Sequence, residues 1–482
     1  MLFSSPVFLF LFLPLVLAAY YLMWARLRNY VLLLASMVFF AWGGVSYSLL
    51  LIFSILFNYF IGLGIGKEPG SRNSKTYLTT GIFLNLLFLG IFKYADFIVG
   101  NLNGLAGLLS FKPFDDPGII LPVGISFYTF QALSYLIDVY RRDAAVQKNP
   151  FNLGLYIALF PQLIAGPIVR YHDIDQQIKT RTIDAASFAY GVRRFIIGLG
   201  KKVLLANNMG MVADIAFNTP VENLSGPIAW LGLVTYALQI YFDFSGYSDM
   251  AIGLGRMFGF TFLENFNYPY IARSVKEFWR RWHISLSTWF RDYLYVPLGG
   301  NRKSNRRTYF NLILVFFVTG LWHGASWSFV LWGFVHGIFL IIERYSGNRF
   351  PESIWKPFQH VYTLFVVLMA WVLFRADTIG YAWSYYGVLF GWSDALPDPG
   401  ILNQVLNREF MLYFIISLLS AAGLFVKMGV YADKLTVSLQ RNYPFIGEAT
   451  RVLQALFLVL ILFACSLYLI TTTYNPFIYY RF

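Results

Sequence analysis

The sequence contains little cysteine and few charged residues. The single cysteine, Cys465, lies in an apolar run, so neither a disulfide nor a thiolate metal cluster can form within the chain. Charged residues make up only 13% of the 482, and apolar residues make up 58%. A soluble domain carries about a quarter charged residues. This composition therefore excludes an ordinary soluble protein and indicates one that crosses a membrane many times.

The charge that is present is mainly basic, with a formal net charge of +13 at pH 7. Lysines and arginines occur in short clusters between apolar runs, as in the cytoplasmic loops of membrane proteins, so we expect no nucleic-acid partner. Basic residues follow the first, third and fifth apolar runs, which predicts an extracytoplasmic N-terminus. The stretch 273–307 holds nine basic residues and is predicted to be largely cytoplasmic or interfacial.

Apolar runs that approach the roughly 20 residues needed to span a bilayer recur along the chain. They lie near residues 6–25, 29–45, 48–66, 77–98, 119–139, 227–243, 309–322, 326–343, 360–376, 409–428 and 450–472. The run 151–169 is interrupted by proline and glycine, which favours a re-entrant segment buried in protein. So little polar sequence separates the runs that we expect a single membrane domain over residues 1–482.

One of the five histidines lies where an imidazole is costly to bury. His323 has Gly320 and Gly324 as near neighbours, in a stretch that otherwise predicts a lipid-buried helix. A titratable group at that depth usually faces a protein interior, a partner or a substrate path, and imidazole exchanges a proton near neutral pH. We therefore expect His323 to be catalytic; the alternative is a buried histidine bonded to a backbone carbonyl. His336, also next to glycine, is expected to have a structural or supporting role.

A second histidine, His283, lies in the basic stretch, where aromatic residues recur at helical spacing over residues 279–293. The spacing predicts an amphipathic helix that carries His283. On its other faces, Arg280, Arg281 and Arg291 are candidates for binding phosphate groups, with lipid headgroups as the alternative ligand. His283 itself is either part of the active site or an ordinary interfacial residue.

Two acids, Asp243 and Asp249, lie at the edge of an apolar run. Acids at membrane depth are functional candidates, and we expect these two chiefly to pack and to pair with arginine. No ligand spacing supports a metal site built from His283, His323 and a carboxylate, so no metal and no bound cofactor is expected. The glycines of residues 253–259 lack the spacing of a dinucleotide fingerprint.

Six longer motifs follow one another along the chain. They are 121–131 (LPVGISFYTFQ), 160–167 (FPQLIAGP), 241–255 (YFDFSGYSDMAIGLG), 277–295 (EFWRRWHISLSTWFRDYLY), 299–302 (GGNR) and 321–325 (LWHGA). Together they resemble the motifs of the membrane-bound O-acyltransferase (MBOAT) family, in particular its bacterial alginate O-acetyltransferases. The resemblance covers most of the chain and weakens beyond residue 345.

The resemblance implies a ring of about eleven transmembrane helices, with re-entrant and interfacial helices, around a central tunnel. His323 matches the central catalytic histidine of the family, and His283 matches its companion on the cytoplasmic approach. Residues 273–345 are thus the expected catalytic motif region, and the three arginines named above are candidates for binding the acyl donor.

The final residues, 477–482 (FIYYRF), resemble a short Phe-x-Tyr-x-x-Phe tail found in envelope-acylation systems of this family. The resemblance implies that Tyr479 carries the acyl group covalently on its way outward. The predicted topology places this tail, residues 474–482, on the extracytoplasmic side. The alternative is that Tyr479 and Tyr480 are interfacial aromatic anchors.

The expected function is that of a multi-pass O-acetyltransferase of a bacterial inner membrane. It would take acetyl from a cytoplasmic thioester, with acetyl-CoA as donor substrate, and pass it across the membrane for O-acetylation of an exopolysaccharide such as alginate. A separate extracytoplasmic acetyltransferase with a serine nucleophile is the implied partner. The alternatives are a D-alanyl transferase acting on teichoic acid and a transporter or flippase, although no internal repeat favours a transporter.

Overall fold

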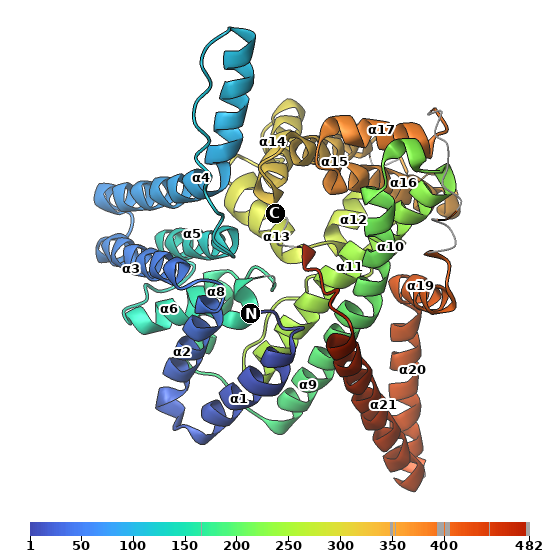
Figure 1. The fold of residues 1–482 in the computed structure, drawn as a ribbon. Coiled ribbons are helices and arrows are strands. Elements are labelled where there is room, and N and C mark those ends of the chain that lie inside the picture. The colour runs from blue at the N-terminus through green and yellow to red at the C-terminus, as the bar shows by residue number, and fades with distance from the viewer. Residues whose placement is uncertain are drawn as a thin grey trace.

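The structure, a computed structural model, describes residues 1–164, 166–347, 350–351, 353–392, 400, 405–442 and 444–478. All regular secondary structure in these residues is helical, which confirms the all-α prediction. In Figure 1 the N-terminal helices (blue to teal) lie on one side and the C-terminal helices (yellow to red) on the other.

The first part of the chain contains short helices as well as long ones. Its elements are η1 Phe8–Phe12, α1 Leu13–Leu22, η2 Ala25–Leu27, α2 Arg28–Ala41, α3 Val45–Lys67, α4 Arg72–Leu108, α5 Ile125–Arg141, α6 Pro150–Ala158, α7 Phe160–Leu163 and α8 Tyr171–Lys179. The middle part comprises α9 Ala185–Gly200, η3 Lys201–Ala206, α10 Asn207–Asn218, η4 Val221–Asn223, α11 Gly226–Met257, η5 Pro269–Ile271, α12 Val275–Arg281, α13 Ile284–Phe290 and η6 Arg291–Tyr295. The last part comprises α14 Asn305–His323, α15 Trp327–Tyr345, α16 Lys356–Arg375, α17 Ile379–Leu389, α19 Arg408–Ala421, α20 Leu424–Asn442 and α21 Pro444–Thr471.

Each apolar run of the sequence overlaps a helix of the structure. Within the described residues, five helical segments are long and apolar enough to cross a membrane: α3, α4, α15, α16 and Gly447–Thr471 of α21. These segments support a multi-pass membrane protein. The ring of about eleven spanning helices stays a prediction.

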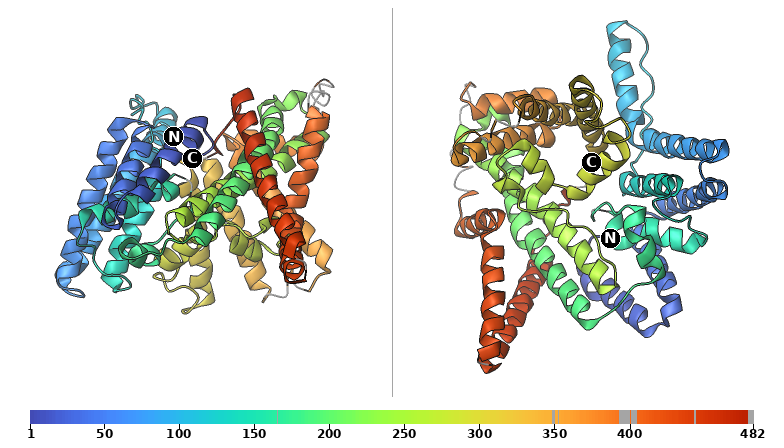
Figure 2. Two further views of the ribbon diagram at one scale, coloured as in Figure 1. Left: turned by 90° about the horizontal axis from the view of Figure 1, so that it is seen from below. Right: turned by 180° about the vertical axis from the view of Figure 1, so that it is seen from behind.

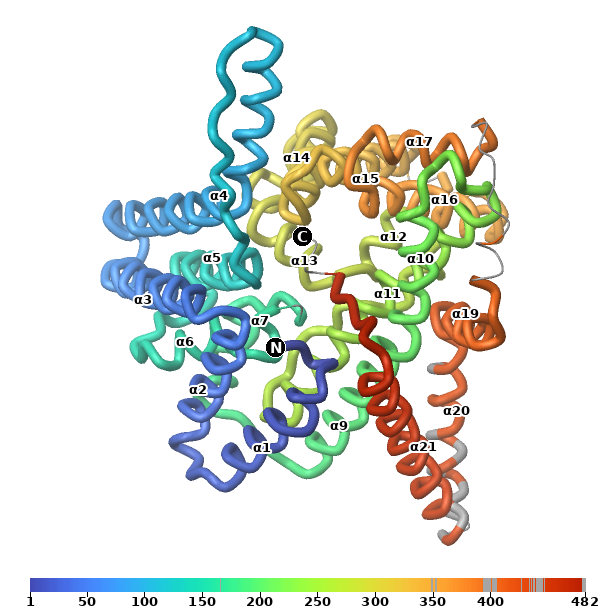
Figure 3. Tube along the Cα trace, viewed as in Figure 1, coloured from blue at the N-terminus to red at the C-terminus, as the bar shows by residue number. Residues whose placement is uncertain are grey.

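Helix α4 is longer than a bilayer requires. Its 37 residues would extend about 55 Å, against about 30 Å of hydrocarbon. Its C-terminal part points away from the other helices as a light-blue arm, and the following loop runs back beside it (Figures 1 and 3). Asn103 connects the helix and the loop of this arm. Its Nδ2 donates to the Phe114 carbonyl at 2.9 Å, and its Oδ1 accepts from the Phe114 N–H at 2.6 Å.

Glycines bring α9 and α11 into close contact. A Cβ atom on Gly191 would lie 2.6 Å from the Gly253 oxygen, and one on Gly198 would lie 2.6 Å from the Gly246 oxygen. Small residues permit this close approach between helices in a membrane. As a result α11 is buried along most of its length, and its polar side chains face protein.

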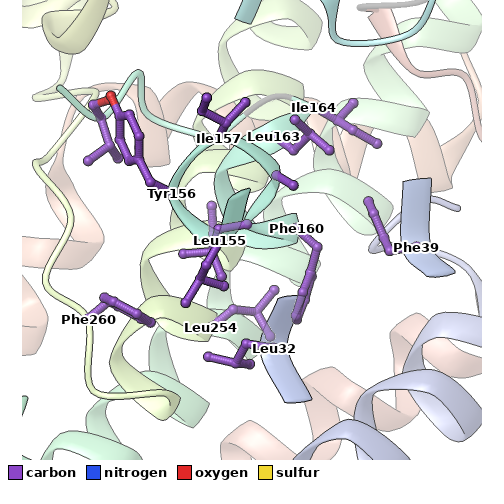
Figure 4. Packing of buried hydrophobic residues seen from close by; sticks show 14 of the residues in the cluster. Leu32, Phe39, Leu155, Tyr156, Ile157, Phe160, Leu163, Ile164, Leu254 and Phe260 are labelled. Carbon is purple, nitrogen blue, oxygen red and sulfur yellow. The ribbon is translucent and has the colours of Figure 1, made fainter. Parts of the chain in front are cut away.

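Residues 153–164 and 166–169 are buried in protein, as the proline and glycine content of the run 151–169 predicts. The helix breaks at Leu159, between α6 and α7, and the Phe160 N–H exposed by the break donates to Ser36 Oγ at 3.1 Å. Non-helical backbone at membrane depth requires such protein partners. Figure 4 shows the apolar side chains packed around this segment, among them Leu155, Phe160, Leu163, Ile164, Leu254 and Phe260.

The residues after α21 return toward the centre of the molecule. This segment, residues 472–478, is dark red in Figures 1 and 3 and runs from α21 toward α11 and α13. Asn475 Nδ2 donates to the Ser4 carbonyl at 2.9 Å. The N-terminal segment and this returning segment are therefore in contact, and Figure 2 shows both on the same side of the molecule.

Candidate active site

His323 occupies the last turn of α14, where the chain turns into α15, and is 5% exposed. A Cβ atom on Gly320 would lie 2.4 Å from the Phe329 oxygen, and one on Gly324 would lie 2.2 Å from the Phe329 ring. Both glycines thus permit α14 and the residue that follows it to approach α15 closely. Aromatic rings surround the imidazole, with centroid distances of 4.9 Å to Trp322, 5.1 Å to Trp332 and 5.2 Å to Phe374.

Two cavities adjoin His323. The larger, of about 110 Å³, is lined by Lys93 on α4, by the start of α5, by His323 and by Phe477 of the returning segment. The smaller, of about 10 Å³, lies between His323 and Ile478. Because a water molecule takes up about 30 Å³ of liquid, the larger cavity has room for a few waters or a small acyl group.

His283 is also buried, but the helix predicted around it is not continuous. α12 ends at Arg281 and α13 begins at Ile284, and His283 between them has a φ of 44°, in the left-handed region. The prediction of one amphipathic helix was therefore wrong. The break is held by Asn265, whose carbonyl accepts the Ile284 N–H at 2.9 Å and whose side chain bonds the imidazole.

Asn265 also determines which nitrogen of His283 carries the proton. Its Oδ1 accepts the Ser285 N–H at 3.2 Å and the Ser285 hydroxyl at 2.9 Å, while its Nδ2 donates to Ser248 Oγ at 2.9 Å. His283 Nδ1, 3.1 Å from the same oxygen, must therefore be the donor. A neutral His283 then has its lone pair on Nε2, which accepts no hydrogen bond from the described residues.

A buried ion pair holds the returning segment. Lys202 Nζ and Asp243 Oδ1 lie 2.7 Å apart, and both side chains are almost fully buried. Lys202 also donates to the Pro476 carbonyl, and Asp243 Oδ2 accepts the Ile478 N–H at 3.0 Å. Asp243 thus pairs with a basic residue as expected, although this residue is a lysine and not an arginine.

The same segment contributes walls to both cavities at His323. The Phe477 ring packs against Tyr247 at a centroid distance of 4.4 Å and borders the larger cavity. Ile478 borders the smaller one. Tyr479, the predicted carrier of the acyl group, lies outside the described residues, as does Tyr480.

The second acid of α11, Asp249, is paired as the sequence predicts. Arg194 Nη2 lies 2.6 Å from its Oδ1, and Lys201 Nζ lies 2.6 Å from its Oδ2. Both cations come from the α9–η3 region, so this acid fastens that region to α11. Over the described ranges, no three His, Cys, Asp or Glu side chains gather as a metal site.

The three arginines proposed for the acyl donor differ in their surroundings. Arg281 pairs with Glu277 at 2.8 Å, and Arg291 pairs with Asp292 at 2.8 Å. Arg280 is exposed and forms no ion pair within the part of the chain that the structure describes. Arg280 and Arg291 are both exposed, and of the three only Arg280 has no carboxylate partner among the described residues.

Two further histidines have supporting positions. His336 is fully buried between Trp279 and Trp332, with centroid distances of 5.1 Å and 5.0 Å. His172, outside the spanning helices, lies with its Nδ1 2.9 Å from Asp138 Oδ2, and chiefly this hydrogen bond raises the pKa of His172 above its ordinary value. That contact joins α8 to α5 and does not involve either cavity.

The site also contains polar residues that the sequence analysis did not identify. Lys93 and Lys202 could have been identified as candidates from the sequence, because each is a charged side chain beside or within an apolar run. Asn265 could not have been identified in this way, since its role depends on contact with His283, which lies 18 positions later.

The chain is similar to proteins of one family. Residues 142–388 match the family model described as MBOAT, membrane-bound O-acyltransferase family. The chain is 43% identical over 510 aligned residues to the probable alginate O-acetylase AlgI of Azotobacter vinelandii, with 100% of both chains covered. It is 39% identical to the peptidoglycan O-acetyltransferase of Helicobacter pylori, with 79% of this chain and 78% of the relative covered.

A more distant similarity extends to a third named activity. The teichoic acid D-alanyltransferase of Streptococcus thermophilus is 30% identical, with 62% of this chain and 71% of the relative covered. The full-length similarity and the family match lead to one conclusion: this chain is an acyltransferase and belongs to the membrane-bound O-acyltransferase family.

Proposed function

We propose that this acyltransferase O-acetylates an extracytoplasmic polysaccharide such as alginate, taking acetyl from cytoplasmic acetyl-CoA and passing it through a central tunnel. The names of the relatives, an alginate O-acetylase and a peptidoglycan O-acetyltransferase, support a polysaccharide acceptor. The apolar helices support a location in the membrane, which we take to be a bacterial inner membrane.

His323 acts as the general base in this proposal. It takes the proton from an attacking hydroxyl as the new C–O bond forms, and returns a proton to the thiolate when the C–S bond of the donor breaks. A positioned imidazole contributes about 10²–10⁴-fold to such a transfer. The aromatic enclosure of His323 supports this role, because it keeps competing water away from the thioester.

His283 supports His323 from the donor side. With Nδ1–H bonded to Asn265, its Nε2 offers an acceptor to the incoming donor or to a proton passing toward His323. The Trp322 ring lies between the two histidines, with centroid distances of 6.2 Å to His283 and 4.9 Å to His323. Arg280, Arg281 and Arg291 bind the phosphates of the donor, and Arg280 is the one of the three that no carboxylate of the described residues pairs with.

Tyr479 receives the acyl group from the donor as a phenyl ester and hands it to the serine of a separate extracytoplasmic acetyltransferase. One observation supports this step above all: Phe477 and Ile478, directly before Tyr479, border the two cavities at His323. Tyr479 follows Ile478 directly in the sequence.

The proposal is tested with the full-length protein in proteoliposomes and radiolabelled acetyl-CoA. We expect label to become bound to the protein, and to be lost in His323→Ala and Tyr479→Phe. His360→Ala and Tyr480→Phe are the matched controls and should label normally. Undiminished labelling of His323→Ala would refute the assignment of the base, and undiminished labelling of Tyr479→Phe would refute the carrier.

The choice of donor is tested in the same vesicles. Replacing acetyl-CoA with a D-alanyl thioester on a carrier protein should give no label, whereas labelling by that donor alone would make the protein a D-alanyl transferase. Polymer movement without any acyl transfer would instead favour a transporter.

A further inference from the structure

We infer that Lys93 is a further catalytic residue, whose ammonium group stabilises the negative charge that develops on the acyl carbonyl oxygen during transfer. The inference rests on the proposed function, because it concerns the same acyl transfer at His323. No role in the reaction follows for Lys93 from the sequence motifs.

Lys93 lies on α4 and its ammonium reaches the end of α14 beside His323. Its Nζ donates to the Trp322 carbonyl and to Ser126 Oγ, the latter at 3.3 Å, and lies 5.8 Å from the centre of the Trp322 ring. Lys93 and His323 both line the 110 Å³ cavity. The ammonium and the proposed base therefore face one small space.

No carboxylate of the described residues pairs with Lys93. The nearest acid along the chain, Asp96, instead accepts the Ile119 N–H at 3.4 Å. Burying an ammonium in a membrane protein without an opposite charge is costly, so such a residue normally serves a function. The cavity is the part of its surroundings where an anionic oxygen could supply the missing charge.

The donor capacity of Lys93 fits this role. A lysine ammonium has three N–H groups, and the described contacts use two of them. The third can donate to a ligand in the cavity. A fixed donor aimed at a developing oxyanion is among the largest single contributions in acyl transfer, worth about 10²–10³ in kcat.

The acyl transfer needs only the thioester, the hydroxyl group and these two side chains. The hydroxyl oxygen attacks the thioester carbon as His323 takes its proton, and the carbonyl π electrons move onto the oxygen that Lys93 contacts. The electrons then return, the C–S bond breaks, and the thiolate leaves with the proton from His323. Lys93 donates a hydrogen bond throughout and ends the cycle unchanged.

A purely structural role for Lys93 makes a different prediction. Lys93 and its neighbour Tyr94 both bond the last carbonyls of α14, since the Tyr94 hydroxyl donates to the Leu321 carbonyl at 2.9 Å. Bonding these carbonyls satisfies the end of the helix. Tyr94→Phe removes such a bond one residue away without touching the cavity, and is therefore the matched control.

The test compares acetyl transfer by Lys93→Gln, Lys93→Arg and Tyr94→Phe in proteoliposomes with equal amounts of folded protein. Gln keeps two N–H donors for the carbonyl and Ser126 but lacks the charge. We expect Lys93→Gln to lower kcat by about 100-fold with the KM for the donor nearly unchanged, Lys93→Arg to recover part of the loss, and Tyr94→Phe to keep the wild-type kcat.

The inference is overturned if Lys93→Gln keeps more than a third of the wild-type kcat, if Lys93→Arg is no better than Lys93→Gln, or if Tyr94→Phe loses as much activity as Lys93→Gln. Should Lys93→Gln not fold, Lys93→Met enters the same comparison. Failure of the proposed function is distinguishable, because the wild-type protein itself would then transfer no acetyl.

Discussion

At the scale of single residues, hydrogen bonds from neighbouring polar side chains fix the orientation of the candidate active-site residues. His283 has a defined tautomer only because Asn265 turns its oxygen toward Nδ1, and Ser285 fixes that oxygen in turn. A misoriented imidazole loses much of the roughly 10²–10⁴-fold that a positioned acid–base group contributes.

Asn265→Ala should therefore lower the rate of acetyl transfer by about 10- to 100-fold, because it frees the His283 ring without removing it. The measurement is transfer of label from acetyl-CoA. Adding Asn265→Ala to His283→Ala should cause little further loss, since residues that act as a unit are not additive. Full additivity of the two changes would show that Asn265 acts independently of His283.

The sequence singled out His323 and His283 as candidate catalytic residues, but it did not reveal which residues position them. His323 stood out because a titratable group in an apolar run is unusual, and the structure places it beside two cavities. The roles of Asn265 and Lys93 depend on contacts that form in the folded protein. Lys93 on α4 contacts the end of α14, and Asn265 in the loop before α12 contacts His283. Those are long-range contacts that local pattern does not reveal.

At the scale of helices, apolar runs predicted where helices lie better than where they end. The aromatic repeat around His283 predicted one helix, but a backbone contact with Asn265 splits it into α12 and α13. Helix α4 continues well past the predicted run, because the arm is stabilised by its own loop through Asn103.

The contact between α14 and α15 yields a test at this scale. A Cβ on Gly333 would lie 2.2 Å from the Phe316 carbonyl oxygen, which is backbone and cannot move alone. Gly333→Ala should therefore cost about 1–3 kcal/mol of stability, as overpacking does, and lower the thermal midpoint measured in detergent.

The control for this change lies one turn further along α15. A Cβ on Gly337 would lie 3.2 Å from Ile313 Cδ1, the end of a flexible side chain. Gly337→Ala should leave the thermal midpoint nearly unchanged. Equal midpoints for the two variants would contradict the close helix packing described at Gly333.

At the scale of the whole molecule, the two terminal segments meet beside the site. Asn475 bonds Ser4, the Ser4 neighbour Phe3 donates its N–H to the Tyr247 hydroxyl at 3.0 Å, and Phe477 packs on Tyr247. A long-range contact of this kind requires both segments to reach the same side of the membrane.

Ser4→Cys combined with Asn475→Cys should form a disulfide under mild oxidation, detected as a linked peptide by mass spectrometry. The native Cys465 is fully buried, so it should contribute little background. Ser4→Cys with Lys112→Cys, the latter on the α4 arm, is the control and should stay unlinked. No link in the first pair would contradict the shared location of the two segments.

The wall that Phe477 gives the larger cavity has a consequence for biosynthesis. The ribosome makes residues 474–478 after α4, α5 and α14, which carry other residues of that cavity, and after α21. The histidine, the lysine of α4 and the start of α5 are thus synthesised before the residue that completes the cavity lining. The larger cavity therefore has its complete lining only after the segment that follows α21 has been made.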